Sequence, residues 1–413
     1  IFKEGLRIPI VRLFDGGELQ DDIMRLLLLN MRLPAERKGD LNAQIAAAKL
    51  GNQRINEFLE THGADYTVRL FDEIVRRTNR RMRAAIEKLP NGSYSFSDVM
   101  DDDGAGTEDI LITLKITKSD HDIFFDFAGS DDQVLGNFNL TFNATQSAVC
   151  YALKALLDPM VPNNQGIFDA IRIEAPPGSF VNCVSPAPVA MRANTCQRVV
   201  DVVIGALAEA LPDQVVGAAN GANTSAVFSG IDPRTSQQYV YLETLGGGMG
   251  ARATKDGKDG VQVNITNTSN LPVEAIEMEY PLRVEDYALI ADSGGVGKHR
   301  GGMGIRRSIR PVGHTCEFNG VGERFRNQPW GIFGGQSGAA GTFEMVDCKG
   351  NTTSLSSKAS RVKLSPDARV VISTPGAGGY GAPEDRKPEA LAEDQASGKF
   401  TKGFLASNYA RKD

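Results

Sequence analysis

The sequence predicts a mixed α/β (α+β) fold, in which helices and strands occupy different stretches of the 413-residue chain. Three observations lead to this prediction. Apolar residues recur at helical spacing up to residue 92, strand-like alternation begins at residue 93, and short apolar segments separated by glycine clusters follow residue 220. We therefore expect a helical region at 1–92, a mixed α/β region at 93–219, and a β-rich domain with a short C-terminal helix at 220–413.

The N-terminal region is predicted to hold two long helices. Asp40 is a favourable N-cap residue, and apolar residues at three-to-four spacing follow it until Gly63 ends the helix. A second helix is expected over about 66–89, where a proline stops it. This helix carries the basic run RRTNRRMR (76–83), which we interpret as a solvated or partner-facing surface rather than an RNA-binding site.

Strand patterns begin after residue 93 and alternate with helices. The segments ILITLKITK (110–118) and DIFFDFAG (122–129) are predicted strands, and a turn at Ser119–Asp122 would join them into a hairpin. Helices are expected at 145–158 and 199–212, the second of them buried on most sides. We expect the N-terminal helices to pack on or beside this mixed core.

Beyond residue 220 the pattern is one of strands and turns. Short apolar segments such as QYVYLETL (238–245), VQVNITNT (261–268) and RVVISTPG (369–376) lie between glycine clusters. This pattern is typical of a β-rich domain and not of repeated βαβ units. The C-terminal tail is expected to form one short acidic helix after a turn that contains proline.

Composition and charge argue against several classes of protein. The net charge of −6 and a pI near 5.5 argue against a protein that binds nucleic acid. The five cysteines are scattered and never spaced as C-x-x-C, so neither a disulfide framework nor a zinc ribbon is expected, and a cytoplasmic location fits best. No apolar run reaches membrane-spanning length. The chain opens on Ile1 without a methionine, and we expect that a segment upstream of it is missing.

The segment ADSGGVGKHRGGMGIRR (291–307) combines six glycines with basic side chains, a composition that often binds phosphate groups. A Walker loop would need Ser or Thr where His299 stands, and a helix where GIRRSIRPV (304–312) alternates like a strand. The nucleotide interpretation therefore fails. We expect these glycines to make turns and to let backbones approach closely, with a loop lining an active-site cleft or a partner interface as the alternative.

Polar side chains gather in NITNTSNLPVEAIEMEYPLR (264–283), among strand-forming residues and prolines. Amide and hydroxyl groups beside carboxylates suit recognition of a cyclic amide or of a substrate that bears a carboxylate. The alternatives are side chains that bond their own backbone, a solvated acidic face, or structural salt bridges. The four histidines show no metal-ligand spacing, so no metal ligand is predicted in this chain, and no G-x-S-x-G nucleophile elbow occurs.

Six segments stand in a characteristic order along the chain. They are DFAGSDDQVLGNFN (126–139), IEAPPGSFVNCVSPAPVAMR (173–192), ETLGGGMGA (243–251), NTSNLPVEAIEMEYPL (267–282), DSGGVGKHRGGMGIRR (292–307) and TPGAGGYGAPEDR (374–386). Together they resemble the hydantoinase B/5-oxoprolinase family, which includes the B-type component of N-methylhydantoinase, caprolactamase, and relatives in acetone and acetophenone carboxylases. The resemblance covers nearly the whole chain.

This resemblance implies a division of labour between two kinds of polypeptide. A partner of the hydantoinase A type, with an actin-like ATPase fold, would use ATP and Mg²⁺ to phosphorylate the carbonyl oxygen of a lactam, an imide or an enolised ketone. The B-type subunit would then help to convert the activated carbonyl, by attack of water in the hydrolases or by capture of CO₂ in the carboxylases. The implied assembly is a hetero-oligomer, for which we expect two copies of each subunit.

Family members also carry a metal-binding region upstream of the segment EGLRIP (4–9), and this region is missing here. The resemblance implies that a divalent metal such as Zn²⁺ or Mn²⁺ would bind in that region, so no metal ligand carries over to this chain. Our hypothesis is a B-type subunit of an ATP-dependent cyclic amide hydrolase. Two alternatives stay open, a subunit of an ATP-dependent ketone carboxylase and a non-catalytic scaffold for the ATPase subunit.

The predicted site residues come from the glycine-rich and amide-rich motifs. As catalytic acids and bases we predict Glu243, Glu274, Glu277 and Asp292, and as substrate-binding residues Arg192, Asn194, Asn267, Thr268 and Arg300. Those between residues 243 and 300 are expected to approach one cleft that faces the ATPase partner. The acids would position water or a substrate N–H, and Arg300 would bind a carboxylate or the phosphate leaving group with its bidentate fork.

Overall fold

The computed structural model describes residues 6, 8–31 and 33–409, so residues 4, 5 and 7 of the EGLRIP segment lie outside it. The chain divides into two compact units, one made of residues 1–84 and 161–170 and the other of residues 85–160 and 171–413. The predicted boundary at 219/220 lies inside the second unit. Helices and strands occupy different stretches of the chain, which confirms the predicted fold class.

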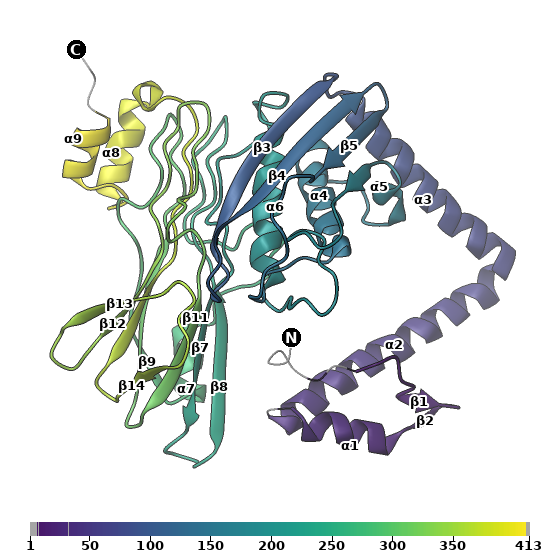
Figure 1. Ribbon diagram of the computed structural model, residues 1–413, viewed down its shortest axis with the longest axis horizontal. Helices are drawn as coiled ribbons and strands as arrows, with labels where there is room; N and C mark the ends of the chain where they lie inside the picture. The colour runs from purple at the N-terminus through teal and green to yellow at the C-terminus, as the bar shows by residue number, and fades with distance from the viewer. Residues whose placement is uncertain (1–5, 7, 32, 410–413) are drawn as a thin grey trace. The chain divides into compact units, whose positions relative to one another are not determined.

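The first unit is largely helical. Its elements are β1 (Phe14–Asp15), β2 (Glu18–Leu19), α1 (Asp21–Leu29), α2 (Pro34–His62), α3 (Ala64–Ile86) and α5 (Gln165–Phe168) (Figure 1). The first long helix ends at Gly63 as predicted, but it begins at Pro34 rather than after Asp40. Proline suits the first turn of a helix because its missing N–H needs no partner there, so the helix starts upstream of the chosen cap residue.

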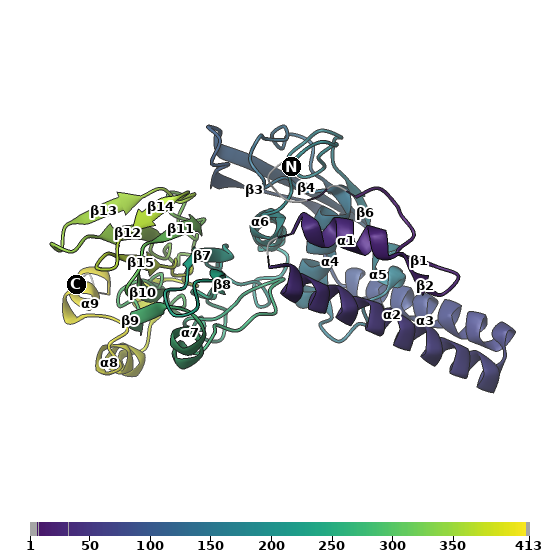
Figure 2. The ribbon, with the colours of Figure 1, turned by 90° about the horizontal axis from the view of Figure 1, so that it is seen from below.

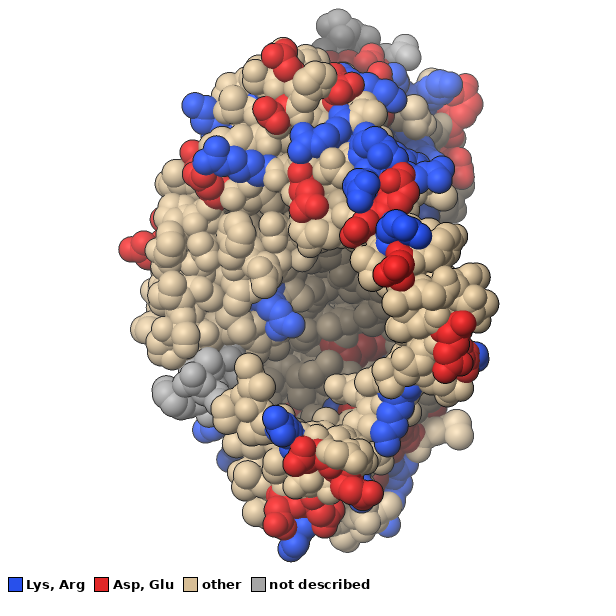
Figure 3. Space-filling view, turned by 90° about the vertical axis from the view of Figure 1, so that its right-hand side faces the viewer, with Lys and Arg blue, Asp and Glu red and all other residues tan. Residues whose placement is uncertain are grey.

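The basic run 76–83 forms an exposed surface of α3. Arg80 Nη2 lies 2.6 Å from Glu73 Oε1, and Arg76 Nη2 lies 3.9 Å from Asp72 Oδ2. Acidic and basic side chains are intermingled on the molecular face drawn in Figure 3. Arg76 and Arg80 are therefore exposed and ion-paired, and the choice between a solvated and a partner-facing surface stays a prediction.

The second unit begins with a four-stranded sheet covered by helices. The strands are β3 (Gly92–Asp102), β4 (Glu108–Ser119), β5 (Asp122–Asp126) and β6 (Arg172–Glu174), and the helices are α4 (Phe142–Leu157) and α6 (Arg192–Ala206). β4 and β5 form the predicted hairpin, whereas β6 joins β5 in parallel. α6 packs on β3 and β4 and against α4 (Figure 1). It begins seven residues before the predicted start at 199, because the polar residues of its first turns are buried and interrupt the apolar pattern.

Two further sheets enclose the main core. One contains β8 (Gln238–Leu245), β7 (Thr224–Ile231), β11 (Cys316–Val321) and β14 (Val362–Leu364), and the other β9 (Leu282–Leu289), β10 (Ile305–Pro311), β15 (Arg369–Ser373), β12 (Thr342–Val346) and β13 (Thr352–Leu355) (Figure 2). Side chains from both sheets form one buried cluster, in which the rings of Phe228, Phe318 and Phe343 pack on one another. One core of the second unit therefore lies between these sheets. Other buried apolar residues of the unit, such as Ile112, Val149 and Val200, belong to β4, α4 and α6.

Two predicted elements of this part differ from the structure. Residues 261–268, all of them described, form no strand, and only Val261 makes an isolated bridge. Asn264 has a positive φ of 51°, a left-handed conformation that ends an extended run. The tail forms two helices, α8 (Pro388–Ala396) and α9 (Lys402–Asn408), because Gly398 adopts a positive φ of 71° and ends the first.

The glycine-rich segments form a bundle of extended chains rather than a sheet. The central segment, 375–379, exchanges backbone hydrogen bonds of 2.8–3.0 Å with four other segments, through Ala218, Ala251, Gly295 and Gln336. A strand in a sheet has at most two such neighbours, so this bundle requires close backbone packing on all sides. A Cβ added to Gly301 would lie 1.8 Å from the carbonyl oxygen of Ala377. Glycine in the 291–307 segment thus serves close backbone approach, which confirms the structural interpretation.

Candidate functional site

A buried group of amide and hydroxyl side chains lies at the N-terminal end of α6. We call it the amide cluster, and its members are Asn194, Gln197, Asn223 and Thr266. Asn194 and Gln197 are three residues apart on α6, so their side chains lie on the same face of the helix. Asn194 Oδ1 accepts the backbone N–H of Asn223 at 2.6 Å, and Gln197 Nε2 donates to Asn223 Oδ1 at 2.9 Å and to Thr266 Oγ1 at 2.8 Å. These bonds attach α6 to the segments at 223 and 266.

Two buried polar atoms in this region have no hydrogen-bond partner among the described residues. One is the carboxamide oxygen of Gln197, whose side chain is fully buried, and the other is Nδ2 of Asn264. An unpaired buried polar atom costs about 1–3 kcal/mol, so native structures keep few of them without a reason. One atom is an acceptor and the other a donor, so each can still take one hydrogen bond.

Residues 264–271, which we call the covering loop, connect the amide cluster to Glu243 on β8. Thr266 of this loop belongs to the cluster, and at the other end the backbone N–H of Leu271 donates to Glu243 Oε1 at 2.7 Å. The Asn270 side chain also accepts the backbone N–H of Gly246 at 3.3 Å. The loop therefore brings the predicted residues Asn194 and Glu243 to its two ends.

The Glu243 carboxylate is buried and has a partner at each oxygen. Its Oε2 accepts from the hydroxyl of Tyr241 and from the guanidinium of Arg307, which stacks on the ring of Tyr287 with its central carbon 4.0 Å from the ring centre. Burial and the nearby negative charge of Glu243 raise the pKa of Tyr241, so this hydroxyl stays protonated and donates. In this arrangement Glu243 holds the covering loop against β8 and β10.

Four other predicted residues lie on or near these elements without joining the buried contacts. Asn267 and Thr268 are exposed members of the covering loop, and Arg192 is exposed in the first turn of α6. Glu274 is exposed on α7 (Val273–Glu279), directly after the loop. On the same helix, Glu277 Oε1 accepts the backbone N–H of Val284 at 3.0 Å. Roles of these side chains on a substrate remain predictions.

Arg300 lies in a different network near the C-terminal helices. Its Nη1 donates to Asp259 Oδ1 at 2.7 Å, and its Nε donates to Asp394 Oδ1 at 2.9 Å. Asp394 lies on α8 and also accepts from Arg386, which bonds Asp256 through Nη1 at 2.8 Å. The guanidinium of Arg300 is buried, and none of the three predicted glutamates, Glu243, Glu274 and Glu277, is among its partners. Among the described residues, no contact joins Arg300 to Glu243.

Asp292 likewise binds the C-terminal tail. Its Oδ1 accepts the backbone N–H of Thr401 at 2.7 Å, and its Oδ2 accepts the Thr401 hydroxyl at 2.9 Å. Thr401 is the N-cap residue of α9, so Asp292 fixes the start of that helix. Asp292 and Arg300 thus contact the C-terminal tail, whereas Glu243 contacts the covering loop, and a single cleft lined by all three stays a prediction.

Sequence reasoning missed Gln197, Asn223, Thr266 and Arg307. Gln197 gave little signal, because it lies in the polar stretch ahead of the predicted helix start at 199 and its burial follows only from the packing of α6. The sequence suggests only that Arg307 is one of the basic residues beside the glycines. In the structure it lies on β10 with its side chain fully buried. Asn223 gave no comparable signal, since its partners are distant in sequence.

A buried charge network fixes α6 next to the amide cluster. Arg324 Nη2 donates to Asp98 Oδ2 at 2.8 Å and to Asp201 Oδ2 at 2.9 Å, and Arg198 Nη1 lies 3.3 Å from Asp98 Oδ1. Burial acts to raise the pKa of Asp98, but the charges of Arg324 and Arg198 outweigh it and lower the pKa to about 2. Because Arg198 directly follows Gln197, this network also sets the position of the cluster.

The described residues do not provide a metal site. Among residues 6, 8–31 and 33–409, no group of three or more His, Cys, Asp or Glu side chains is arranged to hold a metal ion. No helix in this part of the chain is long and apolar enough to cross a membrane. The divalent metal that the family resemblance implies is expected in the region upstream of EGLRIP, so a metal bound there stays a prediction.

Residues 1–383 match the family model described as Hydantoinase B/oxoprolinase. The chain belongs to this family. A protein of Pseudomonas sp., provisionally described as the B component of a D-/L-hydantoinase, is 33% identical over 97% of this chain and 69% of its own length.

Two solved structures superimpose on nearly the whole chain. The crystal structure of ATP-dependent caprolactamase from Pseudomonas jessenii matches with a TM-score of 0.89 and 26% identity, over 99% of this chain and 72% of the other. The nucleotide-free structure of an acetone carboxylase matches with a TM-score of 0.88 and 18% identity, over 99% of this chain and 61% of the other. The second likeness shows the fold alone.

Proposed function

We propose that this hydantoinase B-family chain is the B-type subunit of an ATP-dependent cyclic amide hydrolase. The carrying observation is the family match over residues 1–383, together with the agreement of the fold with an ATP-dependent caprolactamase. In this proposal a hydantoinase A-type ATPase holds ATP and Mg²⁺ and phosphorylates the amide carbonyl. The two polypeptides form a hetero-oligomer with two copies of each.

The chemistry explains why two activities, phosphorylation and hydrolysis, are needed. An unstrained amide is a poor electrophile, and phosphorylation of its oxygen supplies a good leaving group, so that water can attack the carbon. The role proposed for this chain is to bind and orient the ring amide. Gln197 Oε1 would accept the ring N–H and Asn264 Nδ2 would donate to the ring oxygen, since both atoms are buried and unpaired among the described residues. The covering loop, which carries exposed Asn267 and Thr268, would admit the substrate.

The test of this function uses the purified complex of the full chain with its ATPase partner. With ATP and Mg²⁺, we expect release of phosphate and ring-opened product from hydantoin, caprolactam or 5-oxoproline. The partner alone should show little coupled turnover. Activity with none of these ring amides, or equal activity without this chain, would contradict the proposal, and the latter result would support a scaffold.

A ketone carboxylase subunit is the second candidate, because the fold also matches an acetone carboxylase over 99% of the chain. The same complex should then fix labelled bicarbonate into acetone or acetophenone in the presence of ATP. Carboxylation with no ring opening would replace the hydrolase proposal by this alternative.

The amide-recognition role has its own test in Gln197→Leu. Removal of the carboxamide should raise the KM for the ring amide about 10- to 100-fold, the effect of about 1–3 kcal/mol lost from one buried hydrogen-bonding group. The matched control is Gln133→Leu, because Gln133 lies outside the amide cluster and the covering loop, and its Oε1 accepts the backbone N–H of Val184 at 2.8 Å. An equal rise in KM in both variants, with both folded by circular dichroism, would remove Gln197 from the binding role.

A further inference from the structure

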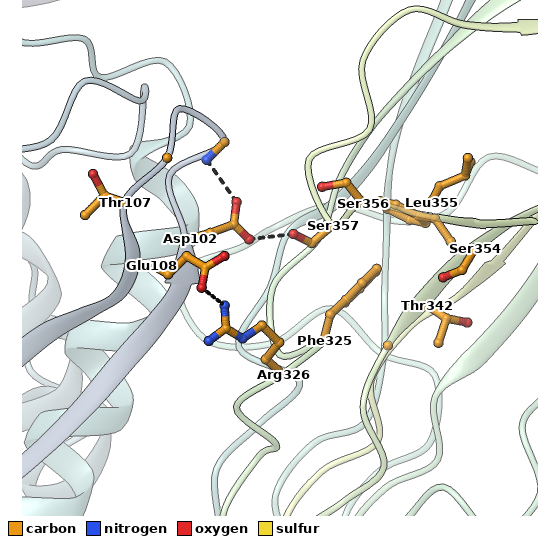
Figure 4. A pocket seen from close by; sticks show the side chains of 14 residues that line it. Asp102, Thr107, Glu108, Phe325, Arg326, Thr342, Ser354, Leu355, Ser356 and Ser357 are labelled. Atoms are coloured by element: carbon orange, nitrogen blue, oxygen red, sulfur yellow. Dashed lines mark hydrogen bonds and ion pairs between the residues drawn. The ribbon is translucent and has the colours of Figure 1, made fainter.

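A cavity of about 400 Å³ lies in the second unit, away from the covering loop in sequence. It lies between the turn that joins β3 to β4, the start of β12 and the end of β13 (Figure 4). Its apolar side is formed by Phe325, Phe343 and Leu355, with the ring of Phe325 packed edge-on against that of Phe343 at 4.9 Å. This volume and this mixture of an apolar wall with a few polar groups are typical of small-molecule sites.

Hydroxyl groups form much of the rest of the lining. Thr342 and Ser354 make no side-chain hydrogen bond to the described residues, and both are exposed. The Ser357 hydroxyl donates to Asp102 Oδ2 at 2.6 Å, while Asp102 Oδ1 accepts the backbone N–H of Gly104 at 2.9 Å (Figure 4). Each carboxylate oxygen has more than one lone-pair site, so Asp102 can accept further bonds from a ligand. The cavity therefore offers a ligand more hydrogen-bond acceptors than donors.

The charges of the lining disfavour an anion. Arg326, the one cation among the lining residues, is paired to Glu108 at 2.6 Å and to Asp109 at 2.9 Å. Asp102 and Glu108 leave the lining with one net negative charge. A ligand that brought a phosphate or carboxylate would meet these acids without a free counter-charge.

We propose that this cavity binds a small uncharged ring compound bearing several hydroxyl groups, of the monosaccharide or cyclic polyol class. The C–H face of such a ring would pack on Phe325, and its hydroxyls would donate to Asp102 and exchange hydrogen bonds with Thr342 and Ser354. A ring of this size fits a cavity of about 400 Å³. The proposal is independent of the amide hydrolase function, because it uses none of the residues of the amide cluster or covering loop.

The test is saturation-transfer NMR on the full chain with myo-inositol, D-glucose and D-ribose, each at millimolar concentration. We expect saturation transfer to the ring protons of at least one probe, with glucose 6-phosphate and glucosamine bound no better than glucose. Ser354→Trp, which fills the cavity from β13, should weaken the binding at least tenfold. Thr353→Trp is the matched control, since Thr353 is exposed on the same strand but does not line the cavity.

Three results would overturn the proposal. One is that no probe of the neutral panel binds to the wild-type chain. Another is that Ser354→Trp and Thr353→Trp bind the probe equally well. The third is preferential binding of glucosamine or glucose 6-phosphate by tenfold or more, which would assign the cavity to a charged ligand.

Discussion

Replacing Arg300 by lysine distinguishes a structural role of this residue from a role on the substrate. In the wild type its guanidinium makes two bonds to Asp259, at 2.7 and 3.2 Å, and one to Asp394, at 2.9 Å. A fourth bond runs from Nη1 to the Gly301 carbonyl oxygen at 3.0 Å. A lysine ammonium at the end of a flexible stem can keep about one of the three bonds to the aspartates. Each lost charge-assisted bond is worth about 1.5–3 kcal/mol, and the lower value applies because Asp259 and Asp394 keep Lys399 and Arg386 as partners. Arg300→Lys should therefore cost about 3 kcal/mol.

The assay is urea and thermal unfolding followed by circular dichroism, with turnover measured at a temperature where the variant is folded. A loss of about 3 kcal/mol corresponds to a fall in Tm of roughly 4–5 °C for the second unit, because an unfolding entropy of about 2.1 cal/mol/K per residue amounts to about 0.7 kcal/mol/K for a unit of this size. The matched control is Arg306→Lys, because Arg306 makes an exposed ion pair with Asp286 and such pairs contribute about 0–1 kcal/mol. If Arg300→Lys is as stable as the control but loses turnover, the structural argument is refuted and Arg300 acts on the substrate.

Further predictions follow from the glycine bundle and the charge network. Gly301→Ala should destabilise the second unit by about 3 kcal/mol or more, because its Cβ would lie 1.8 Å from a backbone oxygen. The control is Gly403→Ala in α9, which has open space around it and should be neutral or stabilising. Equal unfolding free energies of the two variants would contradict close backbone packing in the glycine bundle. The pKa of Asp98 is lowered from 3.8 to about 2, so its contribution of about 2 kcal/mol to stability is fully present above pH 4 and is lost as the pH falls toward 2. The penalty of Asp98→Asn should therefore be larger at pH 6 than at pH 2.5, and a penalty that does not change with pH would rule out an ionised Asp98.

The sequence by itself determined the kinds of element and most of their order. Periodicity located the hairpin at Ser119–Asp122 and the strand 238–245, because side-chain alternation follows directly from strand geometry. The ordered motifs also indicated the hydantoinase B family before any fold was known. Helix starts were less certain, as at Pro34, since several nearby residues can serve as the first turn.

What only the tertiary structure decided is which polar groups meet. Arg300 and Glu243 both lie in motifs that suggested one cleft, yet Arg300 bonds to aspartates at 259 and 394 while Glu243 bonds to Arg307. Charged side chains of one type look alike in sequence, and their partners depend on contacts between segments far apart in the chain. Gln197 and Asn223 meet for the same reason. Most buried polar groups pair with whichever group the fold places beside them, so the pairing is a property of the packed chain and not of the local motif.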